Sequence, residues 1–178
     1  MRYHDIKRHL KPYAIVAMRK TTINHAFASA IAPCDDYDEA RVRTAIEDLG
    51  QDPDKELHCI YCGDSAETWD HVFATVKESE FSGYGHRLGN LLPCCKPCNS
   101  KKGNKSWETY LAGRSQSDGD LSARRTIIGN YLSKYQVLDP LPVNHSDYAE
   151  LDALKSQVLA LLARADELAS QIRRRNAA

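Results

Sequence analysis

Apolar residues near the C-terminus recur at alternating steps of three and four, after the helix-breaking stretch DPLPVN. Asp147 and Glu150 form a capping box there, so the pattern predicts a helix over residues 147–175. The repeat fills the a and d positions of a heptad with Leu151, Leu154, Val158, Leu161, Ala165, Leu168 and Ile172. This helix either packs on its own domain or forms a homodimeric or antiparallel coiled coil. Leu159 and Leu162 widen the stripe, which favours a broader contact than a strict two-stranded seam.

A second amphipathic helix is predicted in the first third of the chain. It begins at Asp36, with Glu39 three residues later as a capping box, and it stops at Gly50. Its apolar face consists of Val42, Ala45, Ile46 and Leu49. Residues 1–56 are therefore expected to form an N-terminal helical region.

Two further helices are expected in the second half of the chain. One begins at Asn99 or Ser100 and runs past Trp107 to Leu111. The other covers residues 121–135, after a linker of sequence GRSQSDGD. Its inward positions are Ile128, Leu132 and Tyr135.

Short strands are expected on either side of a cysteine turn in the middle of the chain. Residues 58–61 lead into the turn CIYCG, and residues 68–74 follow it. A long polar loop, KESEFSGYGHRLG, then extends to Asn90. These elements predict an α+β protein with an N-terminal helical region (1–56), a central core (57–112), a linker and helix (113–146) and a C-terminal heptad helix (147–178).

Composition narrows the choice of partner. The chain has 178 residues, and 24 Lys and Arg balance 24 Asp and Glu, so no overall basic field favours nucleic acid. Charge is sorted by segment instead, since residues 1–20 are mostly basic and residues 35–56 mostly acidic. A polyanionic partner would have to be bound locally. No apolar run reaches membrane-spanning length and no signal peptide is recognisable, so we expect a soluble, cytoplasmic protein without a membrane partner.

Six cysteines in such a compartment are more consistent with metal ligands or thiols than with disulfides. Two Cys-x-x-Cys pairs have matching spacing, and a closed set of four thiolates is suited to structural zinc. The expected zinc ligands are Cys59, Cys62, Cys95 and Cys98. Cys94 does not fit this spacing and is expected to be a small buried residue. Cys34 is expected to be a lone buried thiol.

Candidate catalytic groups lie between and just after the two cysteine pairs. TWDHV supplies Asp70 and His71, NLLPCCKPCN supplies Asn90 and Asn99, and a lysine-rich stretch follows. An imidazole titrates near neutral pH, so His71 can take a proton from an attacking water. In a regular strand Asp70 and His71 would point to opposite faces. Trp69 and Trp107 are expected to anchor the core.

The order CxxC, DH, N-L-L-P-x-C-x-x-C-N and K-x-G-x-K, from His58 to Trp107, resembles the HNH (ββα-metal) endonuclease family. The resemblance implies a zinc-clasped, treble-clef-like ββα core that presents a histidine base and one divalent ion to a phosphate. His71 matches the base, and Asn90 matches the residue that holds the loop. Asp70 and Asn99 match the ligands of the ion, which would be Mg²⁺ or Mn²⁺ because the donors are hard oxygens.

The function expected from this resemblance is metal-dependent cleavage of DNA, in a restriction, defence or phage-related role. Expected contacts to DNA come from the basic residues around the site, namely Lys96, Lys101, Lys102, Lys105, His86 and Arg87. A homodimer through residues 147–175 would supply two cores for two strands. The alternative is a non-catalytic zinc module that binds nucleic acid or protein, which has no need of Asp70, His71 and Asn99 together. Cleavage of RNA is a third reading, without a recognition signature to support it.

Overall fold

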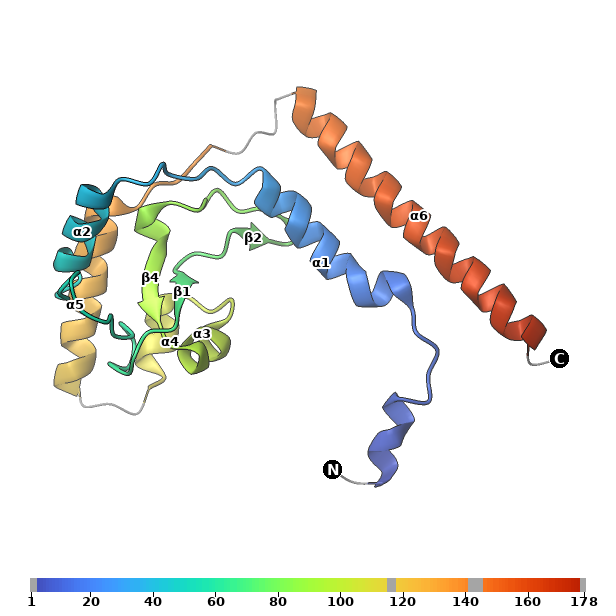
Figure 1. The fold of residues 1–178 in the computed structure, drawn as a ribbon, viewed down its shortest axis with the longest axis horizontal. Helices are drawn as coiled ribbons and strands as arrows, with labels where there is room; N and C mark the ends of the chain where they lie inside the picture. Colours follow the sequence, from blue (N-terminus) through green and yellow to red (C-terminus); the bar gives the residue numbers. More distant parts are fainter. Residues whose placement is uncertain (1–2, 115–117, 141–145, 177–178) are drawn as a thin grey trace. The chain divides into compact units, whose positions relative to one another are not determined.

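The computed structural model describes residues 3–114, 118–140 and 146–176. Over this range the chain forms six α-helices and two small antiparallel sheets of two strands each, so the expected α+β class is confirmed (Figure 1). It divides into two compact units. One comprises residues 28–141, and the other combines residues 1–27 with residues 142–178. The predicted boundaries near residues 56 and 112 fall inside the first unit.

The central sheet of the 28–141 unit pairs β1 (Thr68–His71) with β4 (Leu91–Cys94). The strands are antiparallel, and His71 lies opposite Leu91. Helix α3 (Lys96–Lys102) follows β4 directly and packs against β1. β1 ends three residues earlier than the predicted strand over residues 68–74, and residues 58–61 form only an isolated bridge between His58 and Ser65.

Helix α2 (Glu39–Asp48) lies in the predicted region, but its expected cap is wrong. Asp38, rather than Asp36, is the N-cap, and its carboxylate accepts the N–H of Arg41 at 3.0 Å. The helix ends before Gly50, whose positive φ of 73° suits a residue without a side chain. The predicted apolar face buries Ala45, Ile46 and Leu49 in the core.

The single helix predicted from Asn99 to Leu111 is two helices. α3 ends at Lys102, and α4 (Trp107–Ala112) begins after a turn through Gly103, which has a positive φ of 49°. Ser106 caps α4 by accepting the N–H of Thr109 at 3.1 Å. The sequence KGNKS breaks the helix here because it supplies the left-handed turn and then the cap.

Helix α5 (Asp118–Tyr135) packs against α2, α4 and the turn that precedes β4, and it begins earlier than the predicted residue 121. Its expected inward residues Ile128, Leu132 and Tyr135 are buried, as predicted. Hydrogen bonds fix its position as well. The hydroxyl of Tyr131 donates to the carbonyl of Leu88 at 2.7 Å, and the guanidinium of Arg124 donates to the carbonyl of Ile60 at 2.8 Å.

The polar loop before Asn90 contains a hairpin that the sequence pattern missed. β2 (Val76–Lys77) pairs with β3 (Glu80–Phe81), and the two residues between them, Glu78 and Ser79, both have positive φ. This is the backbone of a tight two-residue turn. After it, the 3₁₀ turn η2 (Leu88–Asn90) leads into β4.

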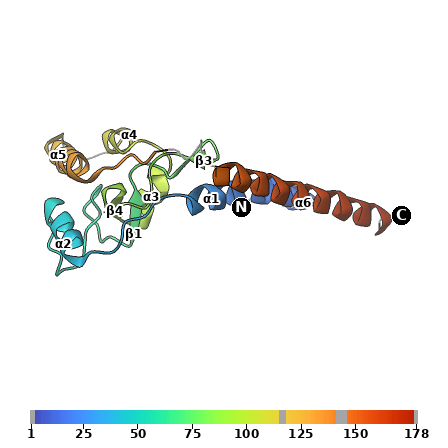
Figure 2. The same cartoon turned by 90° about the horizontal axis from the view of Figure 1, so that it is seen from above.

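The second unit is helical. It contains the 3₁₀ turn η1 (Tyr3–Arg8), most of α1 (Ile15–Ala30) and the long helix α6 (Ser146–Asn176). α1 and α6 run alongside each other (Figures 1 and 2). The carboxylate of Asp166 on α6 accepts the N–H groups of Ile15 at 2.7 Å and Val16 at 2.9 Å, so α6 caps the start of α1.

Two expected core residues are exposed. Trp107 is buried as predicted, but Trp69 is 45% exposed because it occupies an outward position of β1. Cys34, expected to be buried, is also exposed. In the part of the chain that the structure describes, no helix has both the length and the apolarity needed to cross a membrane.

Candidate metal centre and active site

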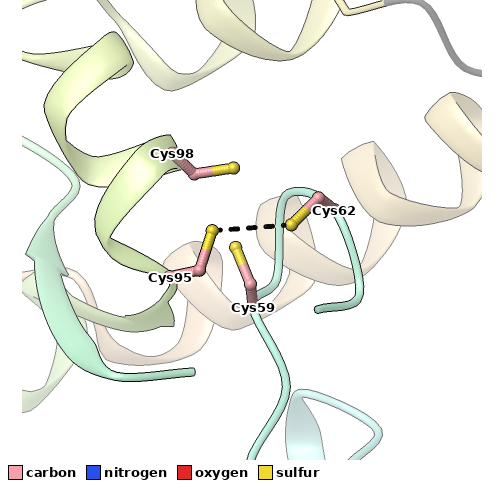
Figure 3. Close-up of side chains that lie close together, drawn as sticks. All are labelled: Cys59, Cys62, Cys95 and Cys98. Carbon is pink, nitrogen blue, oxygen red and sulfur yellow. Dashed lines mark hydrogen bonds between the residues drawn. The ribbon is translucent and has the colours of Figure 1, made fainter. Parts of the chain in front are cut away.

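The four predicted zinc ligands lie together at the junction of two local turns (Figure 3). Cys59 and Cys62 lie in a tight turn that Gly63 closes, with a positive φ of 84° and an N–H bond to the carbonyl of Cys59 at 2.8 Å. Cys95 is the N-cap of α3, and Cys98 lies in the first turn of that helix. The four sulfur atoms are within 4.8 Å of one another, a spacing that a single tetrahedral zinc ion can bridge. The predicted cluster is confirmed as a possible zinc site.

The four thiols lie in different electrostatic surroundings, since burial raises the pKa of Cys62 and of Cys95. Cys94 is fully buried, and its sulfur lies 3.9 Å from the sulfur of Cys59. This contact is the main cause that lowers the pKa of Cys59 to about 4. Arg114 donates from Nη1 to the sulfur of Cys98 at 3.1 Å, which brings positive charge to a site with up to four negative charges. Arg114 was missed from the sequence because it lies 16 residues beyond Cys98.

His71, the last residue of β1, forms a close pair with His86. His71 Nε2 and His86 Nδ1 are 3.0 Å apart, and the two rings meet edge to face. Burial, followed by the charges of His86 and Lys102, lowers the pKa of His71 below its ordinary value of 6.5. His71 is therefore a neutral imidazole at neutral pH, which is the form that can accept a proton.

Asn90 holds the loop between the two histidines. Its side-chain oxygen accepts the N–H of Phe73 at 2.8 Å, and its amide donates to the carbonyls of Phe73 and Gly85, each at 3.0 Å. One carboxamide thus joins the segment after His71 to the segment before His86. These contacts agree with the expected pinning of the loop, whereas any part of Asn90 in the chemistry stays a prediction.

A second brace for His86 comes from the segment that follows α1, which the sequence did not suggest. The backbone N–H of His86 donates to the carbonyl of Pro33 at 2.7 Å, and Cys34 forms a parallel bridge with His86. Gly85 makes this approach possible, because a Cβ atom there would lie 2.1 Å from the carbonyl oxygen of Pro33. No local pattern predicts the contact, since it joins residues far apart in the sequence.

Arg87 was expected to contact DNA, which stays a prediction, and the structure shows it paired within the protein. Its guanidinium bonds to Asp139 at 2.6 Å and to Asp35 at 3.0 Å, and these two carboxylates raise its pKa. Burial alone would raise the pKa of Asp35, but the N–H of Leu88 and the charge of Arg87 lower it. Arg87 therefore joins three segments of the unit.

Asp70 was expected to bind a catalytic ion, but its carboxylate is committed to the protein interior. It is 3% exposed. Its Oδ2 accepts from the Tyr61 hydroxyl at 2.7 Å, and Lys102 Nζ lies 3.1 Å from Oδ2 and 3.2 Å from Oδ1. Burial raises the pKa of Asp70, while the charge of Lys102 opposes that rise. The same ion pair contradicts the expected contact of Lys102 with DNA, because the ammonium is buried.

Asn99 lies near β1, beside the start of the strand and before Asp70. Its amide is 3.4 Å from the hydroxyl of Thr68 and 3.5 Å from the carbonyl of Trp69. Because α3 begins at Lys96, Asn99 is inside the first turn and does not cap the helix. No hydrogen bond between Asn99 and Asp70 is found among the described residues. Asp70 and Asn99, the two expected ion ligands, therefore bond to different groups of the protein and not to a common point.

Three of the four lysines expected to contact DNA are exposed. Lys101 and Lys105 extend into solvent at the end of α3 and in the turn after it, and Lys96 is exposed at the start of the helix. Lys96 also forms a surface ion pair with Glu67 at 3.1 Å. A surface pair of this kind is weak, so Lys96 stays available to an anion.

Comparison with known proteins adds no relative: no family model, no curated protein and no solved structure matches the chain. The chemistry of the site therefore rests on its own residues.

Proposed function

We propose that the unit of residues 28–141 is a phosphodiester hydrolase that cleaves DNA, with His71 as the general base. The observation that carries the proposal is the contact between His71 and His86, 3.0 Å apart at the end of β1. The strand that carries His71 is anchored by the cysteine cluster, and the loop that carries His86 is braced by Asn90 and Pro33. Two buried braces would hold the imidazoles in fixed positions, as general base catalysis requires.

The pair also suggests how a proton would move. If the N–H at His71 Nε2 donates to His86 Nδ1, the other nitrogen of His71 is left to accept a proton from water. The resulting hydroxide would attack phosphorus, and the bond from phosphorus to the 3′ oxygen would break as that oxygen takes up a proton. The hydrogen bond to His86 would stabilise the imidazolium formed at His71.

A zinc ion at the cysteine cluster would not take part in this step. Four thiolates close its coordination sphere, so no position is open for water or phosphate. Such an ion would instead fix the turn that precedes β1 and the start of α3. Cys59, Cys62, Cys95 and Cys98 are the residues that would hold it.

The arrangement does not fit a Mg²⁺ or Mn²⁺ ion bound by Asp70 and Asn99. Both carboxylate oxygens of Asp70 face Lys102, and a divalent ion could reach them only if that ammonium withdrew from a site where it is 2% exposed. A requirement for these ions therefore stays a prediction from the resemblance. The proton transfer proposed at His71 does not depend on an ion at Asp70.

The second candidate function is a zinc module that binds nucleic acid or protein without catalysis. The buried pair of Asp70 and Lys102 favours it, because it gives both residues a structural role that needs no chemistry. Such a module would use the cysteine cluster and the exposed lysines alone. A restriction, defence or phage-related role follows only from the first candidate, the nuclease, and is proposed together with it.

Cleavage of supercoiled plasmid separates the two candidates. Wild-type protein with Mg²⁺ or Mn²⁺ is expected to nick or linearise the DNA, and His71→Ala to lower the rate at least about 100-fold, as expected for loss of a general base. His86→Ala is expected to lower it less. His25→Ala, an exposed histidine of α1, is the matched control and should cut normally. Each sample's zinc content is measured, and equal cutting by His71→Ala would refute the mechanism.

A further inference from the structure

Helix α6 carries an apolar row that its own unit leaves uncovered. None of its described residues is buried. Leu154, Leu161 and Leu168 follow one another at intervals of seven residues and are 46%, 70% and 45% exposed. Large apolar side chains exposed in a continuous row are a common mark of an interaction surface.

This row is not the face that α6 turns toward α1. The half-buried side of α6 includes Leu151, Val158, Leu162 and Asp166, and Asp166 makes the contact with α1. At 100° per residue, the row lies roughly a quarter turn away from that side. The heptad is therefore divided: its a positions Leu151 and Val158 lie on the half-buried side, whereas the d positions Leu154, Leu161 and Leu168 are exposed.

The row has opposite charges at its two ends. Continuing the seven-residue step from Leu154 back along the chain gives Asp147, and continuing forward from Leu168 gives Arg175. The five side chains thus read acid, Leu, Leu, Leu, base along one line of the helix. At 1.5 Å per residue, the two charges are about 42 Å apart, too far to interact within one helix.

We propose that this row pairs with the same row of a second copy of the chain, in an antiparallel arrangement centred on Leu161. In that register Leu161 meets its counterpart, Leu154 meets Leu168, and Asp147 meets Arg175 at both ends. A parallel pair would place like charges opposite each other at each end. The row is complementary to itself only under a two-fold axis, as an isologous interface requires.

A second copy fits this row better than an unrelated partner. A different protein would need its own matching row, whereas a second copy presents the same leucines and the opposite charges in reverse order. The slow drift of a seven-residue row around a 3.6-residue helix also suits the left-handed winding of a coiled coil. Exposed Ile172, four residues after Leu168, extends the apolar contact toward the basic end.

A charge-swap cycle on the full chain tests both the pairing and its direction. The mass of wild type, Asp147→Arg, Arg175→Asp and the double swap is measured over a concentration series by sedimentation. In the antiparallel dimer each single swap creates two like-charge pairs, so the dissociation constant is expected to rise roughly 3- to 30-fold. The double swap restores opposite charges and is expected to return the constant to near the wild-type value.

A second pair of variants tests the leucine row. Leu161→Asp places two carboxylates at the centre and is expected to leave the protein monomeric at every concentration tested. Ala163→Asp adds the same charge on an exposed position turned away from the row and should dimerise normally. Helical content, measured by circular dichroism, should be equal in both variants.

Two results would overturn the proposal. One is a wild-type protein that stays monomeric at about 100 μM, which would assign the row to some other partner. The other is a dimer whose strength is unchanged by either single swap, which would show a different interface or direction. Neither readout uses DNA cleavage, so the outcome is independent of the proposed nuclease activity.

Discussion

The two units of this protein hold themselves together by different means. The 28–141 unit has a continuous core that joins α2, the cysteine turn, β1, β4, α4 and α5. In the helical unit, by contrast, α6 has no buried residue, and the carboxylate of Asp166 bonds it to α1 by capping the start of that helix. The first unit is built to fix side chains in place, whereas the second presents its apolar residues outward. The proposed chemistry and the proposed association with another copy thus concern separate parts of the chain.

Loss of the metal cluster is expected to give the largest difference between the two units. Cys98→Ser removes a ligand from a site whose zinc binding contributes on the order of 10 kcal/mol in small zinc domains. The 28–141 unit should lose its fold while α6 keeps its helix. Circular dichroism and zinc content would measure this. Cys34→Ser, at an exposed cysteine, is the control.

Cys94→Ser sharpens the same comparison. Cys94 lies outside the group of four sulfurs, so we expect this variant to bind zinc normally and to unfold close to the wild-type temperature. If zinc were lost from Cys94→Ser and kept by Cys98→Ser, the assignment of the ligands would be wrong.

Breaking the buried ion pair should have the next largest effect. Lys102→Met leaves the carboxylate of Asp70 buried without its partner, which costs about 3 kcal/mol or more in comparable sites. The double variant Asp70→Asn with Lys102→Met should recover part of this loss. Denaturant unfolding measures both, and Lys101→Met, exposed on the same helix, is the control.

This variant also tests the resemblance from which Asp70 was expected to bind an ion. If Lys102→Met gains affinity for Mn²⁺ and keeps its stability, Asp70 is a metal site that Lys102 blocks. If it loses stability and gains no affinity, the pair is structural.

A smaller loss of stability is expected at Gly89, where two backbone segments of the 28–141 unit are in close contact. Gly89 lies so close to α5 that a Cβ atom would be 1.9 Å from the carbonyl oxygen of Tyr135. Gly89→Ala should therefore destabilise the 28–141 unit by about 1–3 kcal/mol, as overpacking does. Gly129→Ala, on α5 with open space around it, should instead stabilise the unit by about 0.5–1 kcal/mol. Equal melting temperatures for the two variants would contradict this packing.

The smallest effect is expected in the helical unit at acid pH. The N–H groups of Val16 and Ile15 lower the pKa of Asp166 below its ordinary value of 3.8. Its contribution to stability is thus fully present above that value and is lost as the pH falls through the lowered pKa. Asp166→Asn should remove this pH dependence, and Glu167→Gln, its exposed neighbour, should not. Hydrogen exchange of the first turn of α1 follows the change, and identical acid profiles would refute the cap.

Local patterns predicted what depends on local geometry. The spacing of two Cys-x-x-Cys pairs predicted the cysteine cluster that could hold a metal ion, because each pair forms one tight turn and two such turns can bind one ion. Helical periodicity placed α2, α5 and α6, since amphipathic faces repeat every few residues. The predicted helix caps and ends were less accurate. The N-cap of α2 is Asp38 and not Asp36, and the stretch after Lys102 divides one predicted helix into two.

Only the tertiary structure decided which polar groups meet. His71 and His86 are 15 residues apart, and Arg87 and Asp139 are 52 apart. Their pairing depends on how α5, the Pro33 segment and the Asn90 loop pack together. Asp70 was expected to face an ion and Trp69 to face the core, but the reverse sides of β1 carry them. The alternation of side chains along the strand places the carboxylate inward, next to Lys102, and the indole outward. Sequence spacing fixes the reach of a turn, but long-range packing chooses the face that a strand presents and the partner that each side chain finds.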